Sequence, residues 1–128
     1  MIRESFCFDD LLLVPKFSSV SSRSKVDLSV KIRDFTYKHP FIPANMKTIT
    51  GKEMATEIAK SGGLAILHRF MPIEEQVNIA SALVKEFGKS HIGVSVGVKE
   101  NDKEYVDRFV GAGVGVICID IAHGHSAH

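Results

Sequence analysis

Short apolar segments recur along this chain and are separated by segments with a longer hydrophobic period. Four of them stand out, and β-branched residues dominate the last two: 40–45, 64–68, 91–98 and 114–122. Short runs of this kind are typical of β-strands that are covered on both faces. The pattern therefore predicts four strands, the first of which begins at Pro40.

Between these strands the apolar positions change to a helical period. The clearest helix runs from Pro72 to Phe87, and its apolar stripe recurs at helical spacing: Ile73, Val77, Ala80, Val84 and Phe87. Pro72 suits the first turn of such a helix, because the N–H that proline lacks would have no intrahelical partner there. Shorter patterns of the same kind predict one helix before this one and one after it.

Residues at the boundaries support these three helices. Thr50 and Glu53 have the spacing of a capping box at the start of the first helix. Asn101 and Glu104 have the same spacing at the start of the third. A glycine follows each helix, where a left-handed residue is commonly needed: Gly62, Gly88 and Gly111.

The alternation of strands and helices predicts an α/β fold in which right-handed crossovers join parallel strands. An open doubly wound sheet and a closed (βα)8 TIM barrel both fit it. The pattern stops after a fourth strand, and a four-stranded sheet alone would leave its edges unpaired. We therefore expect residues 40–128 to be the first half of a TIM-barrel catalytic domain, with about four strands and three helices. Residues 1–39 are expected to be an amino-terminal extension and loop.

Composition excludes several classes of protein. Apolar residues make up 45% of the 128 residues, which is enough for a core, and the net charge of +1 argues against nucleic-acid and membrane-surface partners. No apolar run approaches the roughly 20 residues that cross a bilayer. The start of the chain lacks the apolar core of a secretory signal. Cys7 and Cys118 have no CxxC spacing, which predicts buried free thiols and a cytoplasmic protein.

Polar or adaptable side chains gather where each predicted strand ends. In chain order these are Asn45 with Met46, then Arg69, Lys99 and Asp120. The carboxyl ends of parallel strands meet at one rim, which is where active sites of α/β folds lie. Helix starts face the same rim, and their N–H groups suit phosphate. The sequence thus predicts one functional site at this rim.

Each candidate also has a simpler interpretation. Asp120 could cap a following helix. His123 and His125 form an HxH pair that could bind zinc, but no second cluster has ligand spacing, so we expect no metal. The remaining candidates would by default be solvated charges, core filler or inert loop residues: Arg69, Lys99, Met46, Ser22 and Arg23.

Taken together, six motifs give the chain a family resemblance that covers nearly its whole length. They are FDDLLLVPK (8–16), SSRSKVDLS (21–29), PANMKTI (43–49), LHRF (67–70), SVGVKE (95–100) and IDIAHGHS (119–126). The chain resembles the inosine monophosphate dehydrogenase and GMP reductase family, and its ANM, SRS and HRF triplets look more like GMP reductase. Many of the dehydrogenases carry a pair of small regulatory domains after the second helix, an insertion that is missing here.

This resemblance implies a (βα)8 barrel enzyme that is usually a homotetramer. GMP reductase deaminates the purine nucleotide GMP to IMP with NADPH, through a cysteine that attacks the purine C2. That cysteine belongs to the second half of the barrel, and neither Cys7 nor Cys118 matches it, so we expect this chain alone to be inactive. The nearest alternative is an inosine monophosphate dehydrogenase, which oxidises IMP with NAD. A metal-dependent barrel hydrolase and a non-catalytic fragment that binds partner subunits are more distant alternatives.

The resemblance also implies roles for residues at the last strand and at the second. Asp120, with Ile121 and Ala122, matches the segment that lies against the nicotinamide riboside of the cofactor, where a carboxylate can accept both ribose hydroxyls. Arg69 matches a basic position beside the cofactor that is commonly lysine in GMP reductases, and the two side chains are not interchangeable. Two histidines then become loop residues that shape the cofactor site: His123 and His125.

Two further pairs take roles from the same resemblance. Ser22 and Arg23 match a loop that reaches the adenosine end of the cofactor across a subunit interface, where a guanidinium suits the 2′-phosphate of NADPH. Asn45 and Met46 match the rim beneath the base and ribose of the nucleotide substrate. Lys47 stands where the family more often has aspartate.

Overall fold

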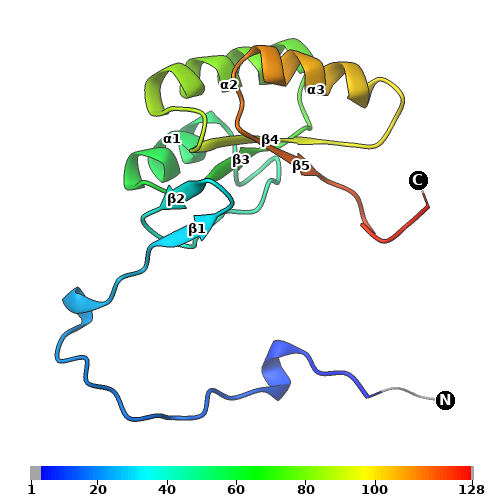
Figure 1. Cartoon of the computed structure of the whole chain (residues 1–128). Helices are drawn as coiled ribbons and strands as arrows, with labels where there is room; N and C mark the ends of the chain where they lie inside the picture. The colour runs from blue at the N-terminus through cyan, green and yellow to red at the C-terminus, as the bar shows by residue number, and fades with distance from the viewer. Residues whose placement is uncertain (1–3, 128) are drawn as a thin grey trace.

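Three parallel strands form the centre of the molecule, and a computed structural model describes residues 4–127 of it (Figure 1). The strands are β3 (Ala65–Leu67), β4 (Ile92–Val96) and β5 (Val116–Ile119), which lie side by side in that order. The helices are α1 (Lys52–Ser61), α2 (Ile73–Phe87) and α3 (Asp102–Gly111). Helices α2 and α3 connect successive strands, so the predicted α/β alternation with a parallel sheet is confirmed.

The helices cover one face of this sheet, and the core lies between them and the strands (Figure 1). Leu67 of β3 pairs with Val94 of β4, which in turn pairs with Ile117 of β5, so their side chains point to the same face. Phe109 of α3 and Leu83 of α2 are buried against this row. Burial of each large side chain contributes about 1.5–3 kcal/mol, which explains why the apolar positions predicted these elements well.

The predicted helix ends are correct at two of three glycines. Gly62 ends α1 in the left-handed region, at φ 86°, and Gly88 ends α2 at φ 88°. Gly111, however, is the last residue of α3 itself, and the positive φ of 82° belongs to Gly113. Helix α2 spans Ile73–Phe87, so Pro72 precedes the helix as its N-cap instead of occupying its first turn.

Neither predicted capping box forms. The N-cap of α1 is Gly51, while the side chain of Thr50 is fully buried and donates its hydroxyl to the carbonyl oxygen of Ala44 at 2.7 Å. At the start of α3 the side chain of Asn101 caps nothing. The carboxylate of Asp102 instead bonds back to the loop before the helix, where its Oδ2 accepts a hydrogen bond from the backbone N–H of Lys99 at 2.7 Å.

The predicted first strand, residues 40–45, is wrong: within the described chain this segment forms no strand. Pro40 and Pro43 lack the N–H groups that a strand donates to its neighbours. The apolar residues of the segment are therefore not enough to pair it with another strand. The sheet around which the helices pack therefore has three strands where four were predicted.

A β-hairpin that the sequence pattern missed lies just before this segment. Strands β1 (Val30–Ile32) and β2 (Phe35–Tyr37) pair antiparallel, and Arg33 in their two-residue turn has φ 52°. The buried Tyr37 donates its hydroxyl to the carbonyl oxygen of Ser90 at 2.9 Å and packs edge-on against His91. The hairpin is thereby fixed to the amino-terminal side of β4.

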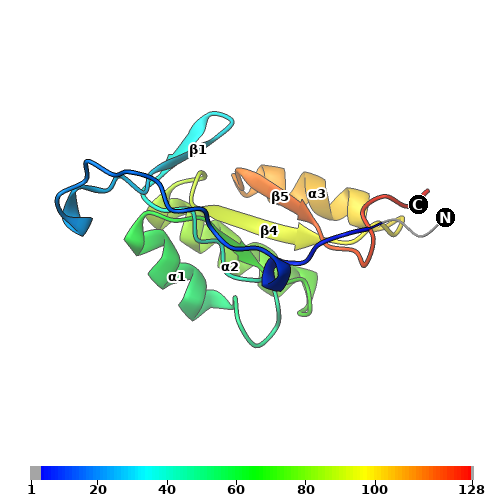
Figure 2. The same ribbon diagram turned by 90° about the horizontal axis from the view of Figure 1, so that it is seen from below.

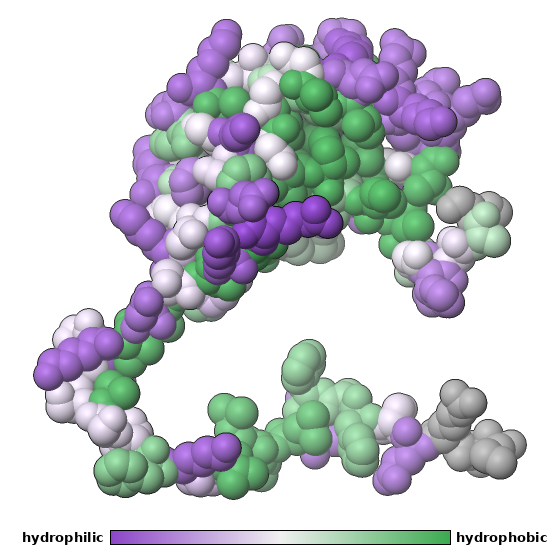
Figure 3. Space-filling view, in the orientation of Figure 1, coloured by the Kyte–Doolittle hydropathy of each residue, from purple (hydrophilic) through white to green (hydrophobic). Residues whose placement is uncertain are grey.

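Residues 4–29 form an extended arm that leaves the body at β1 and passes beneath it (Figures 1 and 2). Its only regular structure is two short 3₁₀ turns, Phe8–Asp10 and Arg23–Lys25. Leu12 and Leu13 are almost completely exposed, and the apolar side chains of the arm face solvent in Figure 3. Cys7 is also exposed, so the prediction of a buried thiol is wrong there. Across residues 4–127, none of the helices is long and apolar enough to cross a membrane.

Candidate functional site at the carboxyl ends of the strands

The carboxyl ends of the three parallel strands bring together two side chains that are 51 residues apart in sequence. Arg69 lies two residues beyond the end of β3, and Asp120 follows β5 directly. The Nε–H of Arg69 donates to Oδ2 of Asp120 at 3.1 Å, and the two side chains are 36% and 32% exposed. Because water screens a pair this exposed, it contributes at most about 1 kcal/mol to stability. The pair is therefore better suited to binding than to holding the fold together.

The turn around Arg69 is shaped by its neighbours. His68 is buried, and its Nδ1 accepts the backbone N–H of Phe70 at 3.1 Å, which bends the chain and turns Arg69 outward. The guanidinium carbon of Arg69 lies 5.1 Å from the centre of the Phe70 ring. This is the distance of a cation–π contact, so the ring and the carboxylate of Asp120 together fix the guanidinium plane.

Asp120 is held through its own backbone. Its N–H donates to the carbonyl oxygen of Val96 at 2.8 Å, which continues the bonding between β4 and β5 one residue past the end of β5. The next residues, which the sequence predicts to lie against a cofactor, are Ile121, half-buried, and Ala122, exposed. The small, exposed side chain of Ala122 near the fixed carboxylate leaves room for a flat ligand to approach it.

Gly97 follows β4 between these two side chains, and sequence reasoning missed it. A β-carbon on Gly97 would lie 2.7 Å from Oδ2 of Asp102 and 3.4 Å from Nη1 of Arg69. A β-carbon there would therefore disturb the start of α3 and would come into van der Waals contact with Arg69. The available signal was a glycine next to the last residue of the predicted strand 91–98.

Two buried polar residues were also missed, and both bond to backbone carbonyls. Gln76 donates its side-chain amide to the carbonyl oxygens of His68 and Ser95, each at 3.1 Å. The hydroxyl of Ser95 donates to the carbonyl oxygen of Leu67 at 2.7 Å. A glutamine within an otherwise apolar helical stripe was the only sequence signal.

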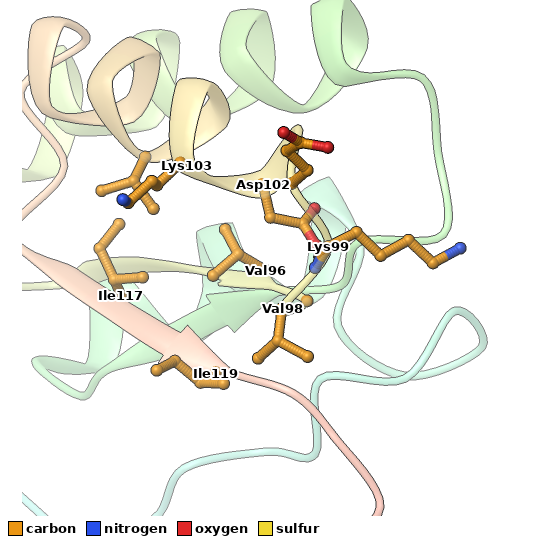
Figure 4. Close-up of a pocket in the computed structure, with 10 residues that line it drawn as sticks. Val96, Val98, Lys99, Asp102, Lys103, Ile117 and Ile119 are labelled. Atoms are coloured by element: carbon orange, nitrogen blue, oxygen red, sulfur yellow. Dashed lines mark hydrogen bonds between the residues drawn. The ribbon is translucent and has the colours of Figure 1, made fainter. Parts of the chain in front are cut away.

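A polar cavity of about 350 Å³ opens at this rim between the starts of α2 and α3. Its lining includes Arg69, Gln76, Lys99 and Tyr105. A second, more apolar cavity of about 560 Å³ lies beside it, between α3 and β5 (Figure 4). Figure 4 shows that the amine of Lys99 extends away from this second cavity. Lys99 thus shares the rim with Arg69, as predicted.

The predicted substrate residues lie on the loop before α1. Met46 is half-exposed, and Nδ2 of Asn45 is buried without a hydrogen-bond partner among the residues that the structure describes. The same loop reaches β3, because the N–H of His68 donates to the carbonyl oxygen of Thr50 at 3.3 Å. Between residues 4 and 127, however, no hydrogen bond joins Asn45 to Arg69.

Ser22 and Arg23 lie on the extended arm, away from the strand ends (Figure 1). The hydroxyl of Ser22 accepts the N–H of Ser24 at 3.3 Å and so caps the short 3₁₀ turn that carries Arg23. Both residues are exposed. The structure does not bring them to Arg69 and Asp120 within one chain, and their cofactor role stays a prediction.

The remaining titratable residues near β5 are two histidines and a thiol. The rings of His123 and His125 meet edge-on with centres 6.4 Å apart. Within the described part of the chain, no group of three or more His, Cys, Asp or Glu residues is placed to hold a metal ion. Cys118 is half-buried, and burial, assisted by the negative charge of Asp120, raises the pKa of its thiol.

Comparison with known proteins identifies the family. A model of the IMP dehydrogenase / GMP reductase domain matches residues 5–128. A GMP reductase of Acidovorax sp. (strain JS42) is 37% identical over 125 residues, which is 96% of this chain and 37% of that protein. A GMP reductase of Streptococcus agalactiae serotype V is 40% identical over 121 residues, or 94% of this chain and 36% of that protein.

An inosine-5′-monophosphate dehydrogenase of Nitrosopumilus maritimus is 49% identical over a shorter stretch of 77 residues, which is 59% of this chain and 16% of that protein. The chain thus spans a little over a third of the length of the GMP reductases it matches. The family model, in contrast, covers nearly every residue from the arm to the loop after β5. On these grounds the chain belongs to the IMP dehydrogenase / GMP reductase family.

Proposed function

We propose that the protein acts as an NADPH-dependent GMP reductase, which converts GMP to IMP and ammonia, and that this chain supplies the first half of its (βα)8 barrel. Relatives named GMP reductase align over 94–96% of the chain, from the arm to the loop after β5. The dehydrogenase relative aligns over 59%. The connection from α2 to β4 is also only residues 88–91, which leaves no room for regulatory domains.

The observation that carries the proposal is the contact between Arg69 and Asp120 at the strand ends. When bound, NADPH supplies the hydride for the reduction. Asp120, with its Oδ2 on Arg69, would accept hydrogen bonds from the two ribose hydroxyls of the nicotinamide half. Arg69 would hold that carboxylate in place through its Nε–H, and its other N–H groups would present positive charge to the rim. Ile121 and Ala122 would lie along the same riboside.

The nucleotide substrate would bind on the loop before α1. The buried, unpartnered Nδ2 of Asn45 fits a role as donor to an acceptor on the base or ribose, because such a group is costly to leave unbonded. Met46 would lie beneath the same nucleotide with its adaptable side chain. The catalytic cysteine would come from elsewhere in the barrel, since Cys7 lies on the arm and the pKa of Cys118 is raised.

Ser22 and Arg23 would bind the 2′-phosphate of NADPH on a neighbouring subunit of a homotetramer. The exposed position of Arg23 on an arm that leaves the body is compatible with this role. Replacing Arg23 by alanine in the intact protein should weaken NADPH binding by about 1.5–3 kcal/mol, the value of a charge-assisted hydrogen bond, and should leave NADH binding nearly unchanged. Equal losses for both cofactors, measured by titration calorimetry, would remove Arg23 from this role.

The second candidate is an inosine monophosphate dehydrogenase, which is favoured by the 49% identity to the Nitrosopumilus maritimus enzyme over 77 residues. Two absorbance assays at 340 nm on the intact protein separate the candidates. We expect NADPH to be consumed when GMP is added. NADH formation from IMP and NAD, with no NADPH consumption, would establish the dehydrogenase instead.

A further inference from the structure

The side chain of Gln76 joins the ends of two strands. Gln76 lies in the first turn of α2 and is only 3% exposed. Its Nε2 donates to the carbonyl oxygen of His68, just beyond β3, and to that of Ser95, near the end of β4. The two bonds use both amide hydrogens, so this one group fixes the separation of the two strand ends.

That separation determines whether Arg69 can reach Asp120. The two residues follow β3 and β5, which are not neighbours, because β4 lies between them. Adjacent strands are about 4.8 Å apart, so the pair has to bridge roughly 10 Å of sheet across the end of β4. The contact between Arg69 and Asp120 therefore depends on two distances at the carboxyl ends, that from β3 to β4 and that from β4 to β5.

Different hydrogen bonds fix each of these two distances beyond the ends of the strands. On the β5 side, the backbone N–H of Asp120 donates to the carbonyl oxygen of Val96. On the β3 side, Gln76 bonds both strand ends, and Ser95 adds its hydroxyl bond to Leu67. Because His68 directly precedes Arg69, a bond to the carbonyl of His68 sets where the arginine begins.

We infer that Gln76 is a positioning residue for the site: its amide holds β3 and β4 together at their carboxyl ends and thereby keeps the Nε–H of Arg69 on Asp120. This inference rests on the proposed function only for its catalytic consequence, since the geometry stands without it. Both hydrogen bonds of the Gln76 side chain go to backbone carbonyls, so it acts on the site through the strand ends.

The test replaces Gln76 by methionine, which has a similar length and no donor, in the intact protein. The readout is the exchange rate of the Arg69 Nε–H with water, measured by nuclear magnetic resonance on arginine side chains. We expect exchange to become up to about fivefold faster, the factor that corresponds to the full contribution of an ion pair this exposed. Gln76→Asn keeps the amide but is too short to reach both carbonyls, and should give an intermediate rate.

A matched control separates positioning from general loss of stability. Leu83→Ala changes a buried residue of the same helix, about 10 Å further along its axis and away from the strand ends. It should lower the unfolding midpoint while leaving the Arg69 Nε–H unchanged. Unaltered exchange in both Gln76 variants, or an equal acceleration in Leu83→Ala, would overturn the inference.

Turnover gives the catalytic consequence. We expect Gln76→Met to lower kcat/KM for NADPH by about 10- to 100-fold, because small misplacements of binding groups have effects of this size. Leu83→Ala should stay within about twofold of the unchanged protein at a temperature where both are folded. If the unchanged protein consumes no NADPH with GMP, the proposed function fails, while the exchange measurement still decides the role of Gln76.

Discussion

Gly97→Ala tests the packing of the strand ends with the smallest possible change, one methyl group. The new β-carbon would lie 2.7 Å from Oδ2 of Asp102, which is closer than real contacts allow. The carboxylate can rotate away, but it then loses the hydrogen bond from the N–H of Lys99. The Nη1 of Arg69, at 3.4 Å from the new carbon, is at ordinary van der Waals distance and can stay in place.

The expected change in the free energy of unfolding follows from these contacts. Loss of the bond between Lys99 and Asp102, at an exposed helix start, destabilises the protein by about 1.5–2 kcal/mol. The lower chain entropy of alanine in the unfolded state offsets about 0.5–1 kcal/mol of this. The net result is a loss of about 1 kcal/mol. A matched glycine is Gly111, at the end of α3 with open space around it, where alanine should stabilise by up to about 1 kcal/mol.

Urea unfolding of both variants measures this difference of about 2 kcal/mol. The decisive control repeats Gly97→Ala in a protein that already carries Asp102→Ala, which lacks the displaced carboxylate. If the contact with Asp102 causes the loss of stability, Gly97→Ala should no longer destabilise the protein in the Asp102→Ala background. A double-mutant cycle measures this difference. The same cost in both backgrounds, or a Gly97→Ala variant as stable as Gly111→Ala, would refute the argument.

Three other expectations follow from single contacts. Tyr37→Phe should destabilise by about 1–2 kcal/mol in urea unfolding, because the carbonyl oxygen of Ser90 loses its donor; no change would mean that the hairpin does not dock through this bond. Iodoacetamide at pH 8 should label Cys118 more slowly than the exposed Cys7, because the raised pKa of the Cys118 thiol leaves less thiolate. The labelling rate of Cys118 should increase as the pH rises, and equal rates for the two cysteines would contradict the burial of Cys118. Asp120→Asn should raise KM for NADPH and NADH alike while stability changes by less than about 1 kcal/mol; an unchanged KM would remove Asp120 from the ribose role.

Local pattern was enough wherever a segment's burial depends on its own periodicity. Helix α2 was predicted almost residue for residue, because its apolar stripe alone determines which face packs on the sheet. The local pattern failed where hydrogen bonding to other segments determines whether a strand forms. Residues 40–45 have the apolar content of a strand, yet two prolines limit the bonds that the segment can donate. The hairpin at 30–37 has a turn with positive φ at Arg33, where no glycine signalled it.

The functional site was likewise predictable from the sequence only in part. The sequence alone determined which side chains stand at the carboxyl ends of strands, because strand ends and the direction of parallel strands follow from the alternation of elements. Arg69, Lys99 and Asp120 were found by that reasoning. Only the tertiary structure decided which of them touch, because Arg69 and Asp120 belong to strands separated by β4. Gln76 and Gly97 act on groups that folding brings close. A glutamine in an apolar stripe or a glycine near a strand end does not show which groups these are.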